Sequence, residues 1–95
     1  MKPRKSKDLK SVLQQKGFIL NPDKHDHQFY VLYVGGKKQH ISTFLSHGIK
    51  EYGDSLMSKM KKQLKFRDTQ KAEDFFDCPL SKEGYIEMLQ EDGEL

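Results

Sequence analysis

The segment HQFYVLYVGGKKQHISTF, residues 27–44, decides the fold of this chain. Residues 27–34 are rich in aromatic and β-branched side chains, which favour a strand. Gly35-Gly36 is a hairpin signal, and residues 39–44 have the composition of the returning strand. Because apolar residues occupy both parities of the first strand, we expect both faces of the sheet to have some cover.

A helix and a short strand are expected before this hairpin. Leu9, Val12 and Leu13 recur at helical spacing, so the pattern predicts a helix over residues 6–16, capped by Ser6 and ended by Gly17. Its last residues, Gln14-Gln15-Lys16, are expected to face water. The apolar run 18–20 predicts a strand, and Asn21-Pro22-Asp23 has the chemistry of a turn.

After the hairpin, residues 45–52 read as a connection with a turn at Ser46-His47-Gly48, and Gly53-Asp54-Ser55 marks the start of a second helix. Its apolar stripe consists of Leu56, Met57, Met60 and Leu64. Its outer face carries Lys59, Lys61, Lys62 and Lys65.

Two further helical segments are expected at the C-terminal end. Residues 71–76 can form a helical turn, and Ser81 can cap a last helix that carries Tyr85, Ile86 and Leu89. These segments are too apolar to remain exposed to solvent, so we expect them to pack on the domain, against the second face of the sheet.

Charge divides the chain into a basic core and an acidic extension. Residues 1–67 carry a net charge of +10 and residues 68–95 a net charge of −7, within a total of +3. At 95 residues the chain is too short for two independent cores, so we expect one domain over residues 1–67 with residues 68–95 packed on it. Excess positive charge favours a polyanion as partner.

Composition also excludes several functional classes. Cys78 is the only cysteine, and neither a signal peptide nor a long apolar run is visible, so a cytoplasmic protein without a membrane partner is expected. No glycine-rich phosphate loop or Ser-His-Asp pattern is visible, which argues against nucleotide hydrolysis and acyl transfer. We expect no cofactor.

Histidine near a basic surface points to chemistry on phosphodiesters. His25 and His27 lie where a turn becomes a strand, and imidazole can accept and donate a proton near neutral pH. RNA supplies its own nucleophile, the 2′-hydroxyl, so one well-placed base and a few cations suffice for cleavage.

The order helix, three antiparallel strands, helix is that of the double-stranded RNA-binding domain, and within this α+β class the chain resembles the HicA family of toxins. The resemblance covers about residues 6–66. It is carried by Gln15-Lys16-Gly17-Phe18, His27-Gln28-Phe29, residues 46–51 (SHGIKE) and residues 60–64 (MKKQL).

The resemblance implies the toxin of a type II toxin–antitoxin system, an endoribonuclease that cleaves mRNA without a metal and is neutralised by a HicB-type antitoxin. His27 matches the family's strand histidine. The family usually places a small Gly-Ser pair before it, where this chain has Lys24-His25-Asp26, so His25 stays a second candidate. Whether the chain forms a homodimer is left open.

Several residues are candidates for contacting the RNA. Tyr30 and Tyr33 can stack on a base if either faces outward. The candidate phosphate ligands are Lys24, Lys37, Lys38 and Lys50, together with Lys59, Lys61 and Lys62 on the last core helix.

Two alternatives compete with a ribonuclease. A non-catalytic RNA-binding or regulatory module needs only the basic surface, and the missing Gly-Ser pair favours it. A metal site needs His40, on the returning strand, to lie across from His25 and His27. The spacing lacks the close Cys/His pairs of structural zinc sites, so we assign no metal ligands.

Overall fold

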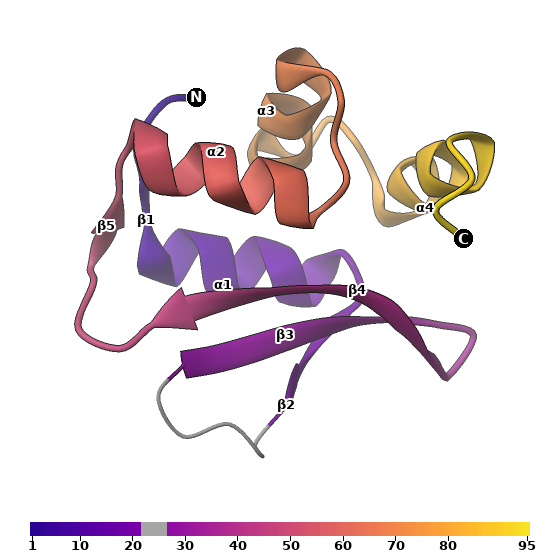
Figure 1. Ribbon diagram of the computed structural model, residues 1–95, viewed down its shortest axis with the longest axis horizontal. Helices are drawn as coiled ribbons and strands as arrows, with labels where there is room; N and C mark the ends of the chain where they lie inside the picture. The colour runs from indigo at the N-terminus through magenta and orange to yellow at the C-terminus, as the bar shows by residue number, and fades with distance from the viewer. Residues whose placement is uncertain (22–26) are drawn as a thin grey trace.

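A computed structural model describes residues 1–21 and 27–95 of the chain. The fold is mixed α+β, with a three-stranded antiparallel sheet and four helices in the described residues (Figure 1). In chain order the elements are β1 (Arg4–Lys5), α1 (Ser6–Gln15), β2 (Phe18–Asn21), β3 (His27–Val34), β4 (Lys37–Ser46), β5 (Glu51–Tyr52), α2 (Asp54–Gln63), α3 (Thr69–Asp77) and α4 (Lys82–Glu91).

The main sheet has the strand order β2–β3–β4, and its central strand agrees with the prediction at both ends. Gly35 and Gly36 have φ values of 58° and 79°, which is the positive-φ pair that a tight two-residue hairpin turn requires. Next to the turn Val34 pairs with Lys37. The register shifts between Val31 and Tyr33, and beyond this shift His27 pairs with Ser46 at the far end of the hairpin.

All four helices of the described chain lie on one side of the sheet (Figure 1). The expectation that the C-terminal segments cover the second face is therefore wrong. The reason is visible on that second face, where His27, Phe29 and Phe44 pack against one another across β3 and β4. These aromatic side chains are half-buried, and none of the described helices covers them.

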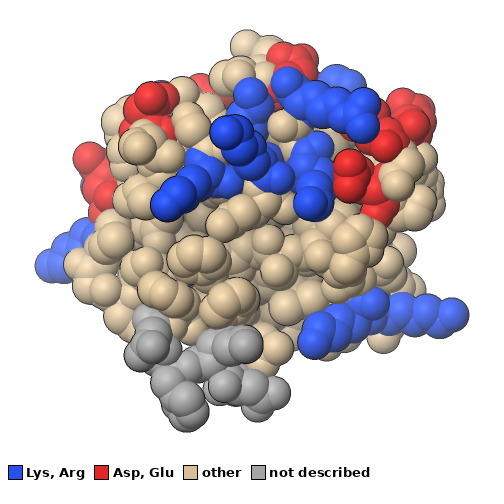
Figure 2. Space-filling model, in the orientation of Figure 1, with Lys and Arg blue, Asp and Glu red and all other residues tan. Residues whose placement is uncertain are grey.

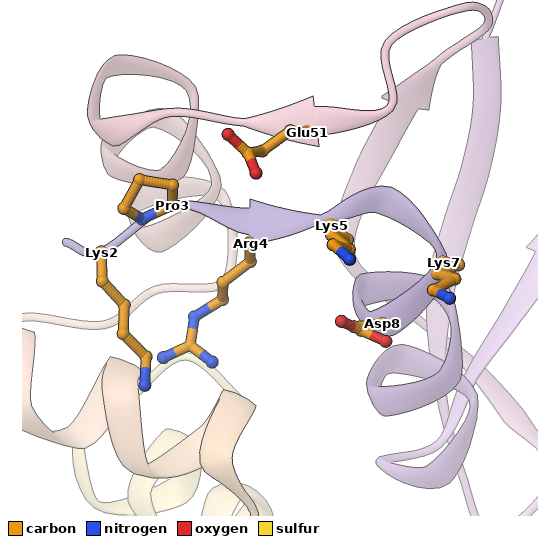
Figure 3. A pocket seen from close by; sticks show the side chains of 7 residues that line it. All are labelled: Lys2, Pro3, Arg4, Lys5, Lys7, Asp8 and Glu51. Carbon is orange, nitrogen blue, oxygen red and sulfur yellow. The ribbon is translucent and has the colours of Figure 1, made fainter.

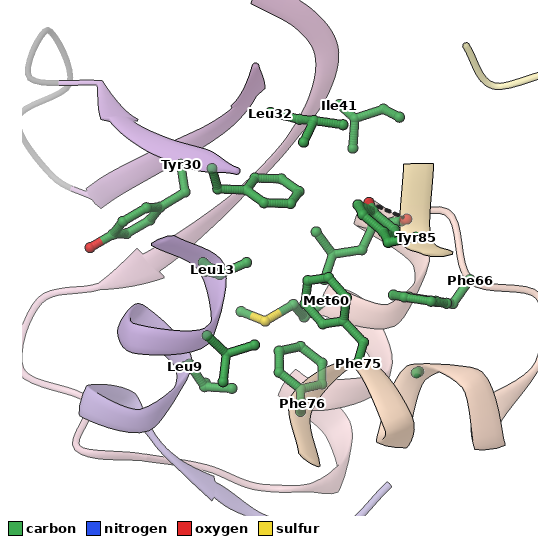
Figure 4. Packing of buried hydrophobic residues seen from close by; sticks show 14 of the residues in the cluster. Leu9, Leu13, Tyr30, Leu32, Ile41, Met60, Phe66, Phe75, Phe76 and Tyr85 are labelled. Carbon is green, nitrogen blue, oxygen red and sulfur yellow. Dashed lines mark hydrogen bonds between the residues drawn. The ribbon is translucent and has the colours of Figure 1, made fainter. Parts of the chain in front are cut away.

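One hydrophobic core joins the sheet to every helix. Phe18 of β2 and Leu13 of α1 belong to the same buried cluster as Phe75 of α3 and Tyr85 of α4 (Figure 4). The ring centroids of Tyr85 and Phe75 are 4.9 Å apart, and those of Tyr85 and Phe18 are 6.1 Å apart. The acidic extension thus completes the same core as the basic segment.

The hydrogen bonds and backbone angles at the helix ends show which of the predicted helix caps form. Gly17 has a φ of 95° directly after α1, and the Ser81 hydroxyl caps α4 by accepting from the Gly84 amide at 3.0 Å, both as predicted. Ser6 does not cap α1, because its hydroxyl donates to the carbonyl of Ile49. Lys16, expected to face water, is buried, and its ammonium donates to the carbonyl of Leu80.

A second, two-stranded sheet was not predicted. Residues 4–5 of β1 pair antiparallel with residues 51–52 of β5, which ties the start of the chain to the connection after β4. The Ser6 amide adds a hydrogen bond of 2.8 Å to the Lys50 carbonyl. None of the helices in the described residues has the length and apolarity that a membrane span needs.

Candidate functional site

His27 begins β3 and points away from the helices. Cross-strand partners share a face, so its pairing with Ser46 places both side chains on the uncovered face, beside Phe29 and Phe44. The imidazole ring lies 4.7 Å from the Phe44 ring and 6.5 Å from the Phe29 ring, centroid to centroid. The aromatic neighbours fix the orientation of the imidazole.

The two ring nitrogens of His27 have different surroundings. Nδ1 is buried and has no hydrogen-bond partner among the described residues. Because Nδ1 is buried, a ligand that approaches from solvent would have to contact the imidazole at Nε2.

The other predicted histidine and one predicted lysine, His25 and Lys24, lie outside the described residues. His40 lies on the same outward face as His27. The residue of β4 that pairs with His27 is Ser46, however, and His40 precedes Ser46 by six positions. At about 3.3 Å per residue, the separation along the strand is roughly 20 Å. His40 therefore does not lie across from His27, as the alternative metal site would require, and no group of three metal-binding side chains occurs in the described part of the chain.

Lys37 and Lys38 lie at the opposite end of the hairpin from His27. They pair with Val34 and Tyr33, so most of the length of β3, about 20 Å, separates them from the imidazole. The two lysines therefore cannot hold the phosphate that contacts His27, because a hairpin puts the turn and the open ends at opposite ends of the strands. These two side chains are exposed at the tip.

The lysines of α2 form a separate basic surface. Lys59 and Lys62 are exposed, while Lys61 is half-buried and donates to the Thr69 hydroxyl at 2.8 Å. Figure 2 shows several basic side chains gathered over the helical layer and another basic group apart from them near the lower edge, with a largely uncharged surface between. The predicted lysines therefore do not converge on one point.

The side chains of the two tyrosines considered for base stacking point to opposite faces of the sheet. Tyr30 is buried on the helix side of the sheet, and this burial raises the pKa of its phenol. Its assignment as a stacking residue is wrong. Tyr33 is only half-buried on the outward face, as the strand alternation allows.

Four lysines surround a hollow near the start of α1. Only one of them was predicted from the sequence as a phosphate ligand. The hollow has a volume of about 610 Å³ and lies between the start of α1 and residues 48–51. We call it the basic hollow; its lining consists of Lys5, Ser6, Lys7, Lys10, Gly48, Ile49, Lys50 and Glu51. Only Lys50 had been predicted, because the pairing of β1 with β5 that assembles the hollow has no signal in the sequence.

A second hollow of about 480 Å³ adjoins the first and shares Lys5, Lys7 and Glu51 with it (Figure 3). Here Arg4 and Lys2 turn toward α3 (Figure 3). Arg4 donates to Asp77 at 2.8 Å and to Glu73 at 2.9 Å, and Lys2 lies 3.3 Å from Asp77. These two cations already have partners.

Comparison with known proteins gives no relative: no family model, no curated protein and no solved structure matches the chain.

Proposed function

We propose that this protein is a HicA-type toxin, an RNA-binding endoribonuclease that cleaves mRNA in the cytoplasm without a metal, with His27 as its general acid–base and a HicB-type protein as its antitoxin. The observation that carries the proposal is the setting of His27. Its ring packs beside Phe44 and Phe29 on the sheet face away from the helices, and its Nδ1 is buried, so a ligand would have to meet Nε2.

The fold order supports this proposal. The first two helices and the main sheet follow the order α1–β2–β3–β4–α2, the helix–three strands–helix order of a double-stranded RNA-binding domain, with the short β5 between β4 and α2 and with α3 and α4 added to the same core. Lys50, Lys59 and Lys62 are exposed on this framework, where they can meet phosphates.

The proposed chemistry needs only the RNA and one imidazole. In the neutral tautomer that carries its proton on Nδ1, the Nε2 lone pair of His27 accepts the proton of a 2′-hydroxyl, which forms the imidazolium; this imidazolium later returns the proton to solvent. The 2′ oxygen bonds to phosphorus as the bond from phosphorus to the 5′ oxygen breaks, and the departing oxygen takes a proton from water. The products are a 2′,3′-cyclic phosphate and a 5′-hydroxyl. Acid–base help of this kind contributes typically about 10² to 10⁴-fold in rate.

A non-catalytic RNA-binding module is the second candidate, and one observation favours it. Lys37 and Lys38 lie far from His27, so the phosphate-holding side chains expected at the catalytic position are fewer than a nuclease would use.

RNA cleavage in the presence of EDTA separates the two candidates. The purified protein is mixed with single-stranded RNA, and both binding and the ends of any products are measured. Cleavage that leaves 2′,3′-cyclic phosphates agrees with the proposal. Binding without cleavage selects the non-catalytic module, and a protein that does neither contradicts both.

A further inference from the structure

The basic hollow combines four cations with an apolar wall. Lys5, Lys7 and Lys50 are exposed around it and Lys10 is half-buried, whereas Ile49 is half-buried and packs against the core. Phosphate groups bind ammonium groups, and a ribose or base gains from an apolar wall. The lining therefore matches the two chemical halves of a nucleotide.

These four lysines have no carboxylate within ion-pair distance among the described residues, although Glu51 lines the same hollow. By contrast, Arg4 and Lys2 next to them are paired with Asp77. Unpaired cations gathered at one hollow produce a local positive potential that attracts a polyanion. The acidic extension thus neutralises the neighbouring cations and leaves these four available.

The hollow also lies near His27. Ser46 is the cross-strand partner of His27, and Gly48, which lines the hollow, follows two residues later. Cross-strand Cα atoms are about 5 Å apart and two residues span at most about 7 Å, so the Cα atoms of His27 and Gly48 are within about 12 Å. Nucleotides adjacent to one cleaved at His27 can reach across that distance.

We infer that the basic hollow is the backbone-binding subsite for single-stranded RNA next to the His27 cleavage position, with Lys5, Lys7, Lys10 and Lys50 holding the phosphates and Ile49 contacting a ribose or base. This inference rests on the proposed function. It assigns the main electrostatic contact to the start of α1 and the loop after β4, and a smaller one to α2 and the hairpin tip.

Two fourfold variants with equal loss of charge test the inference. One replaces Lys5, Lys7, Lys10 and Lys50 with Gln, and the matched control replaces Lys37, Lys38, Lys59 and Lys62 with Gln. Affinity for a short 2′-O-methyl RNA, which lacks the nucleophile and stays intact, is measured over a series of salt concentrations. Thermal unfolding of both variants checks that they fold.

The hollow variant is expected to bind at least tenfold more weakly at low salt, and the slope of log K against log salt is expected to fall by up to about 2.8 if all four contacts are lost. The control is expected to lose less than half of that slope. Equal losses in the two variants, or an unchanged hollow variant, would overturn the subsite while RNA cleavage by the wild type still upheld the proposed function. A wild type that binds no RNA would overturn both.

Discussion

At the scale of single residues, His27 differs from the other described histidines by its aromatic setting. His40 and His47 are exposed, whereas the ring of His27 rests against Phe44 and has one nitrogen buried. An imidazole with a fixed orientation can present one nitrogen to a reacting hydroxyl without an ordering cost at each turnover. The strand that carries His27 follows from the sequence, but the face to which His27 points and its contact with Phe44 depend on the packing of the helices and on the hairpin register.

Tyr85 offers a test of the core that is independent of function. Its hydroxyl donates to the Leu64 carbonyl at 2.8 Å inside the core, and burial raises the pKa of the phenol well above its ordinary value. Tyr85→Phe leaves that carbonyl without its donor, so we expect the free energy of unfolding to fall by about 1–2 kcal/mol. Urea denaturation measures this change.

Tyr33→Phe is the matched control, because Tyr33 is a half-buried tyrosine whose hydroxyl makes no hydrogen bond to the described residues. Its unfolding midpoint is expected to stay close to that of the wild type. An equal loss in the two variants would show that the Tyr85 hydrogen bond contributes nothing specific.

At the scale of elements, β1 and α3 are joined by Arg4. The guanidinium lies 5.2 Å from the centre of the Phe76 ring while it donates to Glu73 and Asp77. The hydrogen bond from Arg4 is the main cause that lowers the pKa of Asp77 in the folded protein. The N-terminal strand is thereby fixed to the extension, across 69 and 73 residues of chain.

This ion pair predicts a pH dependence of stability. Because the folded pKa of Asp77 lies below its unfolded pKa, the contribution is complete above the unfolded value of about 4 and is lost as the pH falls through the folded value. The side chain is 43% exposed, so the contribution is expected to stay below about 1 kcal/mol. We expect Asp77→Asn to destabilise the protein at pH 7 and to have a smaller effect at about pH 3.

Urea denaturation of wild type and Asp77→Asn at the two pH values measures the difference. Asp74→Asn is the control, since Asp74 accepts from Gln70 on its own helix at 3.0 Å and does not contact β1. A loss from Asp77→Asn that is the same at both pH values would contradict the role of the charge.

A helix or strand could be predicted from the sequence where residues close together in the chain determine it. The glycine pair at 35–36 and the periodic apolar residues of α1 and α2 were sufficient for the hairpin and for both helices. The β1–β5 pairing was missed because strands of two residues have no periodicity to recognise. Lys16 was misplaced because its partner, the Leu80 carbonyl, is 64 residues away in the chain.

At the scale of the whole molecule, the acidic extension is part of the core. Phe75, Phe76, Tyr85, Met88 and Leu89 are all buried, and burying five such side chains contributes on the order of 10 kcal/mol. That is comparable with the entire net stability of a small domain. The sequence predicted that these residues pack on the domain. It did not predict the side of the sheet, which depended on how the outward aromatic residues of β3 and β4 pack against one another.

Deletion of residues 68–95 is therefore expected to unfold the protein. We predict loss of the cooperative thermal transition and of the near-ultraviolet circular dichroism signal in the truncated chain. A truncated chain that still unfolds cooperatively would show that residues 1–67 hold a sufficient core without α3 and α4.

The central claim is that His27 cleaves RNA without a metal, and the most direct test is the cleavage rate of His27→Ala against wild type in EDTA. His40→Ala is the control, because it removes an exposed histidine from the same face far from the proposed site. We predict that His27→Ala slows cleavage by about 10² to 10⁴-fold while RNA binding and folding are retained, and that His40→Ala cleaves like the wild type. Cleavage by His27→Ala at the wild-type rate would contradict the account.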